Sequence, residues 1–323
     1  MSLSGCFRPK MRFIRLFLMM LLLAGAPGLC WSATTATPRA ELPSGAEEHG
    51  STSEHGGIPA KPVEVWRIGS FPITNSMIVS WAVALGLIVF AQLATRNMKQ
   101  IPTGAQNFWE WLVEGLYSFL EGIIGHELVK KTFWFFATIF IFILFSNWLG
   151  LIPGFGTIGL GEKGPHGFHV TDPWFRGANA DLNMTLAMSL TFFACWIVWA
   201  LQTNGPIGFL LHLFAPKGET TGFLKALMVV VFIAVGVLEV VSILFRPVSL
   251  SFRLFGNIFA GENMLEAMAN LVPGWFGSII IPIPFYFMEL LVGIVQALVF
   301  MLLTAVFTML ICEHDEGHEK AHH

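Results

Sequence analysis

The second half of the chain carries ionisable and amide side chains within sequence that is otherwise apolar. A charge at bilayer depth is costly, so each such residue is expected to face protein or water and is a candidate for function. An arginine stays protonated at any relevant pH, whereas a carboxylic acid binds and releases protons. Together they could control proton transfer, because an acid that faces a fixed cation favours its ionised form. The residues of this set are Glu239, Arg246, Arg253, Asn257, Glu262, Glu266, Glu289 and Gln296.

Helical geometry sorts the central members of this set onto two faces. Arg253 and Asn257 are four residues apart and share a face, whereas Glu262 follows Arg253 by nine residues, about half a revolution. Glu289 and Gln296 are seven residues apart and lie on one side of their helix. An antiparallel hairpin could bring Gln296 towards Arg253 and Glu289 towards Glu262, although the sequence does not fix that register.

Several of these residues have simpler structural interpretations. Arg246 could contact lipid headgroups or a neighbouring chain, and Glu266 could reach interfacial water; we favour these interpretations for both. Arg253 could form a structural ion pair, but we favour a functional role. Asn257 and Gln296 could join helices through hydrogen bonds, which is compatible with either role.

The elements that must position these side chains are membrane helices. A helix needs about 20 apolar residues to cross the ~30 Å hydrocarbon core of a bilayer. Three segments meet this requirement with no charged residue inside, namely Met77–Ala94, Phe133–Pro153 and Met184–Leu201. Two longer segments follow, Leu224–Val272 and Ile283–Cys312, and as helices they would extend roughly 70 Å and 45 Å. The sequence therefore predicts an all-α integral membrane protein with five crossings.

The last two segments are too long to stand upright in a bilayer, so they are expected to tilt or kink. We predict a strongly tilted antiparallel hairpin that turns at Pro273-Gly274 and at Pro282-Ile283-Pro284. Between the first two spans, an amphipathic helix is predicted to lie on the inner membrane surface or against a helix of another protein. Its apolar positions are Phe108, Trp111, Leu112, Leu116, Phe119, Leu120, Ile123 and Ile124.

The N-terminus resembles a secretory signal peptide. Basic residues precede a short apolar stretch, and small residues follow it, so residues 1–33 are predicted to be a cleaved leader, although a retained first helix is the alternative. Residues 34–72 are expected to form a flexible extracytoplasmic tail, because most of this sequence is poor in large apolar residues. Residues 73–312 form the membrane domain, and residues 313–323 form a cytoplasmic C-terminal tail.

Basic residues in the loops predict the orientation of the chain. Cytoplasmic loops of membrane proteins carry an excess of Lys and Arg. With the N-terminus outside and the C-terminus inside, the inner loops hold five basic residues and the outer loop after the second span holds two. The inner set is Arg96, Lys99, Lys130, Lys131 and Lys217, and the outer set is Lys163 and Arg176.

Composition argues against several classes of function. The net charge of −3 comes without a dense basic patch, which gives no support for nucleic-acid binding. All ten histidines lie outside the apolar spans, and no GxxxxGK motif occurs, so haem and nucleotide chemistry lack their usual residues. The one HExxH pattern, HEKAH at residues 318–322, lies in the C-terminal tail and not within an apolar span, so an intramembrane zinc protease lacks its motif. The C-terminal histidines could bind a metal, but a solvated tail is the favoured interpretation. Cys195 and Cys312 are expected to be buried free thiols.

Five sequence motifs resemble those of the a subunit of F-type ATP synthases, in the expected order. SLSFRLFGNIFAGE at residues 249–262 is similar to the signature helix of that family, and LEVVSILFRPV at residues 238–248 is similar to the part that precedes it. NWLGLIP at 147–153, DLNMT at 181–185 and QALVFMLLT at 296–304 resemble the second, third and last spans. The resemblance extends from about residue 73 to residue 312.

This resemblance implies a role for each candidate. Arg253 would be the stator arginine that faces the rotor carboxylate, with Asn257 and Gln296 as its polar neighbours. Glu262 and Glu289 would line an aqueous half-channel, and Glu239 would have a lesser role in a half-channel. Family members often pair a carboxylate with a histidine at the positions of Glu262 and Glu289, whereas both are Glu here.

The resemblance also implies partners and a location. The expected function is to couple proton translocation to rotation and ATP synthesis, without a cofactor and without catalysis by the chain itself. Expected partners are a rotor ring of c subunits, peripheral-stalk b subunits, the other ATP synthase subunits and the lipid bilayer. The leader suggests a bacterial inner membrane, with the N-terminus periplasmic and the C-terminus cytoplasmic. The alternative from another class is a standalone ion-coupled secondary transporter, which would move its substrate without a rotor ring.

Overall fold

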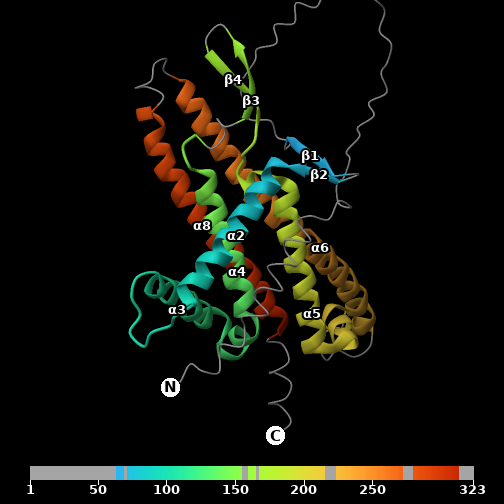
Figure 1. Cartoon of the computed structure of the whole chain (residues 1–323). Helices are drawn as coiled ribbons and strands as arrows, with labels where there is room; N and C mark the ends of the chain where they lie inside the picture. The colour runs from blue at the N-terminus through green and yellow to red at the C-terminus, as the bar shows by residue number, and fades with distance from the viewer. Residues whose placement is uncertain are drawn as a thin grey trace, which may run out of the picture.

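The computed structural model describes residues 63–68, 71–154, 159–164, 167–214, 223–271 and 279–312. The predicted leader, most of the predicted tail, the turn at Pro273-Gly274 and the C-terminal histidines lie outside these residues. Figure 1 shows a helical bundle with two small β-hairpins at one end and helix α3 at the other.

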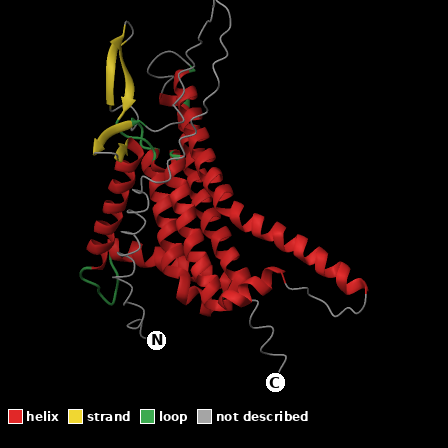
Figure 2. Ribbon diagram, turned by 90° about the vertical axis from the view of Figure 1, so that its right-hand side faces the viewer, coloured by secondary structure: helices red, strands yellow, loops and turns green. Residues whose placement is uncertain are grey.

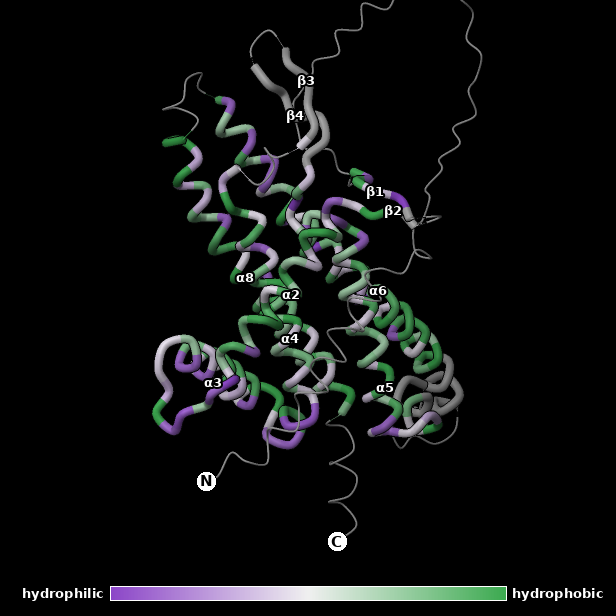
Figure 3. The backbone as a smooth tube through the Cα atoms, in the orientation of Figure 1, coloured by the Kyte–Doolittle hydropathy of each residue, from purple (hydrophilic) through white to green (hydrophobic). Residues whose placement is uncertain are grey.

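Five helices among the described residues are long and apolar enough to cross a membrane. These are α2 (Asn75–Thr95), α4 (His126–Gly150), most of α5 (Leu182–Phe214), most of α6 (Phe223–Asn270) and α8 (Pro282–Cys312). The prediction of an all-α membrane protein with five crossings is therefore confirmed. Figure 3 shows hydrophobic residues along the helical bodies, as lipid contact and helix packing require.

Helix α4 is the central helix of the bundle, because it packs against α2, α3 and α8. Its middle part is almost fully buried; Phe135, Phe136, Ile139 and Ile143 have no exposed surface. The ring of Phe135 meets Trp199 of α5 edge-on, with 5.4 Å between ring centroids. Such close packing, rather than hydrophobic burial from water, is what holds helices together in lipid.

Helices α6 and α8 form the predicted antiparallel pair. The expected turn at Pro282-Ile283-Pro284 is wrong, because these residues form the first turn of α8, where proline is tolerated. Helix α6 spans 48 residues with Pro247 inside it, and α8 spans 31 residues. At 1.5 Å per residue α6 is about 72 Å long, more than twice the hydrocarbon thickness. Figure 2 shows a long helix that runs obliquely out of the bundle, as α6 must to remain in a bilayer. Helix α5 also bends, at Gly205, where φ is +69° and Pro206 follows.

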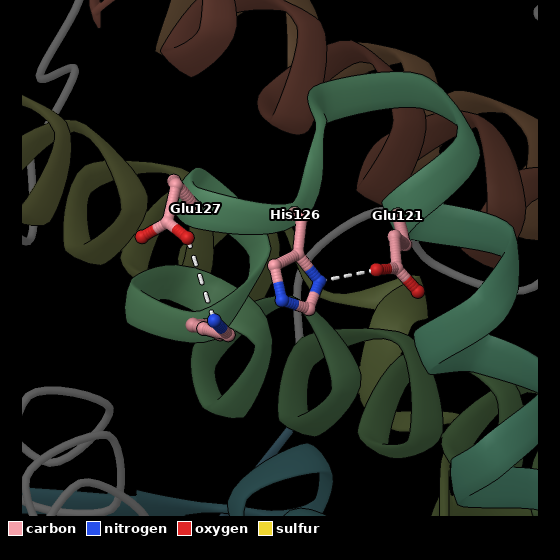
Figure 4. Close-up of polar contacts among 4 residues, drawn as sticks. Glu121, His126 and Glu127 are labelled. Carbon is pink, nitrogen blue, oxygen red and sulfur yellow. Dashed lines mark hydrogen bonds and ion pairs between the residues drawn. The ribbon is translucent and has the colours of Figure 1, made fainter.

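Helix α3 (Ala105–Ile124) confirms the predicted helix between the first two spans. It joins α4 through Gly125, whose φ of +79° is a conformation that glycine adopts readily. Across this turn His126 contacts Glu121 (Figure 4). Three aromatic side chains of α3 remain exposed and are available to lipid or to a partner, so both interpretations of its apolar face stand. They are Phe108, Trp111 and Phe119.

Two short antiparallel hairpins were not predicted. Strands β1 (Glu64–Ile68) and β2 (Phe71–Thr74) pair just before α2, and strands β3 (Gly159–Gly164) and β4 (Gly167–Pro173) pair in the loop after α4. Strand β1 falls at the end of the segment 34–72, for which we expected an irregular tail, so its last part forms regular structure instead. Strand pairing gives hydrogen-bond partners to backbone N–H and C=O groups of these segments.

Candidate functional site

The first part of the site is a pair of carboxylates between α6 and α8. Glu289 of α8 is only 4% exposed. Its carboxylate lies directly against Gly261 of α6, so closely that a side chain on this glycine would overlap it. The neighbouring residue, Glu262, interacts electrostatically with Glu289. Glu289 therefore lies close to Glu262, an approach that the sequence left open, and the absence of a side chain at Gly261 makes room for it.

The carboxylate of Glu262 is enclosed from its other side by two more glycines. A Cβ atom on Gly177, in the segment before α5, would overlap Glu262 Oε1, and one on Gly150 at the end of α4 would stand 3.9 Å from the same oxygen. The backbone of Gly177 is also a hydrogen-bond partner of the carboxylate. The end of α4, the body of α6 and the segment before α5 thus converge on one titratable group.

Arg176, next to Gly177, brings a positive charge to this cluster. Its side chain is 5% exposed, and its guanidinium carbon lies 5.8 Å from the centre of the Phe259 ring. Burial lowers the pKa of Arg176 below its ordinary value, and the charges of Glu262 and Asp181 partly offset that shift. None of its three side-chain nitrogens has a hydrogen-bond partner in the structure.

Asp181 closes the cluster at the start of α5. It is 3% exposed; Ser76 of α2 donates its hydroxyl proton to Oδ2 at 2.5 Å, and the Asn183 backbone N–H donates to Oδ1 at 2.9 Å. The second bond caps the N-terminus of α5, where a carboxylate also interacts favourably with the helix dipole. Asp181 therefore has a structural role that is independent of any proton path.

Buried amide side chains fix the helices around the cluster. Asn179 donates to Asn147 Oδ1 at 2.6 Å, and Asn147 donates to the Gly293 carbonyl oxygen at 3.1 Å, which connects α4, α8 and the segment before α5. Thr185 and Ser251 share a hydrogen bond of 3.1 Å between α5 and α6. Such bonds contribute roughly 0.6 kcal/mol each within membranes, and they set the register of neighbouring helices.

Arg253 and Asn257 lie on a different face of α6 and are not part of this cluster. Both are exposed, whereas Leu254 and Ile258 beside them are buried against the bundle. None of the ion pairs among the described residues involves Arg253. Gln296 is half-buried on α8, and the described residues include no hydrogen bond that joins it to Arg253. The predicted separation of cation and carboxylate on two faces is thus present within this chain.

Arg246 packs inside the bundle rather than pointing only to lipid headgroups. Its guanidinium carbon lies 4.4 Å from the Phe307 ring centre and 5.8 Å from that of Trp196. Cations over aromatic rings are attracted by the ring quadrupole. This contact lies within the chain itself, and it differs from the expected contact with lipid headgroups or a neighbouring chain. Glu239, half-buried seven residues earlier, is its charged neighbour. Glu266 is half-buried near the end of α6.

Sequence reasoning missed the cation of the buried cluster. Arg176 counted only as a loop charge, and Asp181 only as part of a motif, because neither lies within an apolar span. The available signal was the proximity in sequence of a cation and an acid at the entry to a span, RGANAD at residues 176–181. That signal indicates a paired site only when the loop folds back onto the helices.

Fold and site together define a multi-pass membrane protein with a buried acidic cluster near one end of its bundle and an exposed arginine on a neighbouring helix face. Comparison with known proteins narrows this class. A family model described as ATP synthase A chain matches residues 77–309. A relative named ATP synthase subunit a, from Gloeobacter violaceus, is 33% identical over 255 residues, which cover 78% of this chain and 90% of that protein. The chain belongs to the ATP synthase A chain family and has the function of the stator a subunit of an F-type ATP synthase.

The contact at Gly261 leads to a first prediction. Gly261→Ala would displace the Glu289 carboxylate without changing any charge, because the new methyl group needs the same space. From the sequence, Glu289 is expected to lie in the proton path, and small displacements of reacting groups cost large factors in rate. On that expectation, ATP-driven proton pumping by the assembled complex should fall at least about tenfold. Pumping is measured as acidification of membrane vesicles.

Gly86→Ala is the matched control for this variant, because a Cβ atom at Gly86 of α2 meets no atom within 4 Å. It should pump like the wild type. Equal pumping by both variants would show that the position of Glu289 against α6 does not matter for transport.

Proposed function

We propose that Arg253 separates two proton half-channels and faces the carboxylate of a rotor ring of c subunits. The observation that carries this proposal is the division of α6 into two faces, one with exposed Arg253 and Asn257 and the other with Glu262 beside Glu289. A rotor acid that approaches the fixed cation favours its ionised form and must release its proton first. The cation also opposes the direct passage of protons between the two half-channels.

In this proposal Glu262 and Glu289 relay protons between the rotor and the extracytoplasmic side. The cluster includes Arg176 and Gly177, which follow the end of β4 at Pro173 within four residues, so it lies on the side of the hairpins. Figure 1 shows α3 at the opposite end of the bundle. The excess of basic residues near α3 supports a cytoplasmic location for that end. Gln296 and Asn257 would act as polar neighbours of Arg253. Glu239, lower on α6, would serve the other half-channel with a smaller effect.

The free energy available from one proton limits how proton flow can be coupled to ATP synthesis. One charge that crosses 100 mV yields about 2.3 kcal/mol, much less than one phosphorylation needs, so several protons must be combined through rotation. The chain would supply only the path and the fixed charge, and other subunits would perform the ATP chemistry. A leader at residues 1–33 and a bacterial inner membrane, with a periplasmic N-terminus, complete this proposal.

The exposed surfaces of the chain indicate where each partner subunit would bind. Apolar residues are exposed along the Arg253 side of α6; Leu238, Phe245 and Phe252 are 68%, 64% and 55% exposed. A helix with a cation among apolar residues at bilayer depth favours a membrane partner with its own carboxylate over lipid alone, because lipid would leave the cation unpaired. The rotor ring is the proposed partner. Peripheral-stalk b subunits are expected to use other surfaces, such as the exposed aromatic residues of α3.

Site-directed photocrosslinking tests this assignment. A photoreactive phenylalanine analogue in place of Phe245 should crosslink to a rotor subunit in the intact complex, because this side chain is exposed on the Arg253 side of α6. The same analogue in place of Leu85, which is 64% exposed on α2, serves as the control and should label no rotor subunit. Rotor crosslinks from Leu85 but not from Phe245 would place the rotor on another surface and contradict the proposal.

A further inference from the structure

Arg176 is a buried cation whose charge faces the acidic cluster of the outer half-channel. We propose that Arg176 is a positioning residue for proton transfer: its fixed positive charge limits how tightly the cluster around Glu262 holds a proton in transit. This inference rests on the proposed role of Glu262 in the proton path. It adds a second fixed cation, on the loop before α5, to the arginine that faces the rotor.

The geometry places Arg176 against the cluster. Its neighbour in the chain, Gly177, touches the Glu262 carboxylate, and the lack of a side chain at Gly177 allows this approach. The guanidinium packs beside Phe259, which precedes Glu262 by three residues and lies on a nearby part of the α6 surface. With 5% exposure, Arg176 cannot lose its influence to solvent screening as a surface charge does.

The lack of hydrogen bonds distinguishes Arg176 from a structural arginine. A buried ion pair usually satisfies its donors, because unpaired buried donors are costly. Arg176 has three buried nitrogens without partners, and Glu262 Oε2 and Glu289 Oε1 are also buried without partners. By contrast, the exposed Arg67 bonds Glu64 at 3.3 Å. What Arg176 supplies to the carboxylates of the cluster is therefore its charge rather than a hydrogen bond.

The neighbouring charges show why a cation is needed. Glu262 of α6 and Asp181 at the start of α5 act directly on Arg176. Glu289 of α8 acts on Glu262, and Glu266 lies one turn further along α6. Helices α2 and α4 contribute only neutral groups here, such as Ser76 and Asn147. Arg176 is the only cation that acts on Glu262 within the described part of the chain.

Without this cation the acids would repel each other more strongly when ionised, and the cluster would bind a proton more tightly. A relay group that binds its proton more tightly becomes protonated at higher outer pH, but it releases that proton to the next acceptor more slowly. The rate of ATP synthesis should fall when the outer pH is too high to protonate the cluster, and this fall is the alkaline limb of the pH–rate profile. Removal of Arg176 should therefore move the alkaline limb to higher outer pH and lower the maximal rate. Removal of the Asp181 charge should move the limb in the opposite direction.

The experiment uses the complete ATP synthase in proteoliposomes whose lumen represents the extracytoplasmic side. The initial rate of ATP synthesis is measured against lumen pH, while a potassium diffusion potential holds the total proton-motive force constant. The variants are Arg176→Gln, Arg176→Lys and Asp181→Asn, with Arg67→Gln as the control for loss of an exposed arginine. Assembly of each complex is checked by co-purification of all subunits.

We expect the alkaline limb of Arg176→Gln to move up by about one pH unit, as expected for loss of an opposite charge nearby. One pH unit means that the cluster binds its proton about tenfold more tightly, so the maximal rate of ATP synthesis should be up to about tenfold lower. Arg176→Lys should keep the wild-type limb, Asp181→Asn should move it to lower pH, and Arg67→Gln should change nothing. An unmoved limb in assembled Arg176→Gln would overturn the inference.

If Arg176→Gln fails to assemble, Asp181→Asn provides the test instead. This variant should fold, because asparagine keeps an oxygen for the Asn183 N–H and can donate to the Ser76 hydroxyl. An unmoved limb, or a shift to higher pH, in Asp181→Asn would then overturn the inference. Glu262→Gln in the same assay separates this inference from the proposed function. Normal synthesis by Glu262→Gln would contradict the proposed path itself, whereas its loss together with wild-type behaviour of Arg176→Gln would contradict the inference alone.

Discussion

Replacement of Arg253 with alanine is expected to abolish ATP-driven proton pumping while the complex still assembles. Arg253 is exposed on α6 and takes part in none of the ion pairs among the described residues, so its removal should leave the packing of this chain intact. What is lost is the fixed charge that forces a passing acid to ionise. Acidification of vesicles after ATP addition should fall to the level seen without ATP.

Two variants sharpen this prediction. Arg67→Ala removes an exposed arginine that pairs with Glu64 on the first hairpin, and it should pump normally. Arg253→Lys keeps a positive charge but not the planar guanidinium, so any pumping it retains measures how much of the function depends on charge alone. Near-normal pumping by an assembled Arg253→Ala complex would contradict the stator role and favour a structural one.

Glu262→Gln should produce the second large effect, a loss of at least about tenfold in both proton pumping and proton-driven ATP synthesis. Glutamine preserves the shape of the side chain but cannot take up and release a proton. Gly177 and Gly150 lie against one oxygen of this side chain, and the Glu289 carboxylate lies against the adjacent Gly261. The measurement is the initial rate of ATP synthesis after an acid–base transition.

Glu239→Gln is the matched control for this variant, because Glu239 is another carboxylate on α6 and is only half-buried. We expect its rate to fall by less than about threefold, in line with the lesser role proposed for it. A larger loss from Glu239→Gln than from Glu262→Gln would reverse the assignment of the principal relay group.

The membrane spans could be predicted from sequence with little error. The segment Met77–Ala94 becomes α2, Asn75–Thr95, because a run of about 20 apolar residues in a bilayer must satisfy its backbone within a helix. Helix α4 begins at His126, seven residues before the predicted Phe133, since its charged first turns can extend beyond the hydrocarbon core. The hairpin of β3 and β4 escaped prediction because the glycine-rich strand β3, GLGEKG, has no alternating apolar pattern.

Part of the candidate site could also be predicted from the sequence, and part depended on the tertiary structure. The positions of Arg253 and Asn257 on one face of α6 follow from their spacing of four residues, and the structure leaves both exposed on that face. The approach of Glu289 to Glu262 needed the register between two helices, which the sequence left open. That register depends on Gly261, where the lack of a side chain makes room for a carboxylate from another helix.

What the sequence by itself determined is the number and length of the crossings, the two faces of α6 and the family. These properties depend on local composition and helical period, which act within one segment. Only the tertiary structure decided that Arg176 and Asp181 join the acids of α6 and α8, because burial and electrostatic neighbours depend on contacts between distant segments. A loop arginine is indistinguishable from a solvated one in the sequence; here the folding of the loop onto the helix ends makes it part of the acidic cluster.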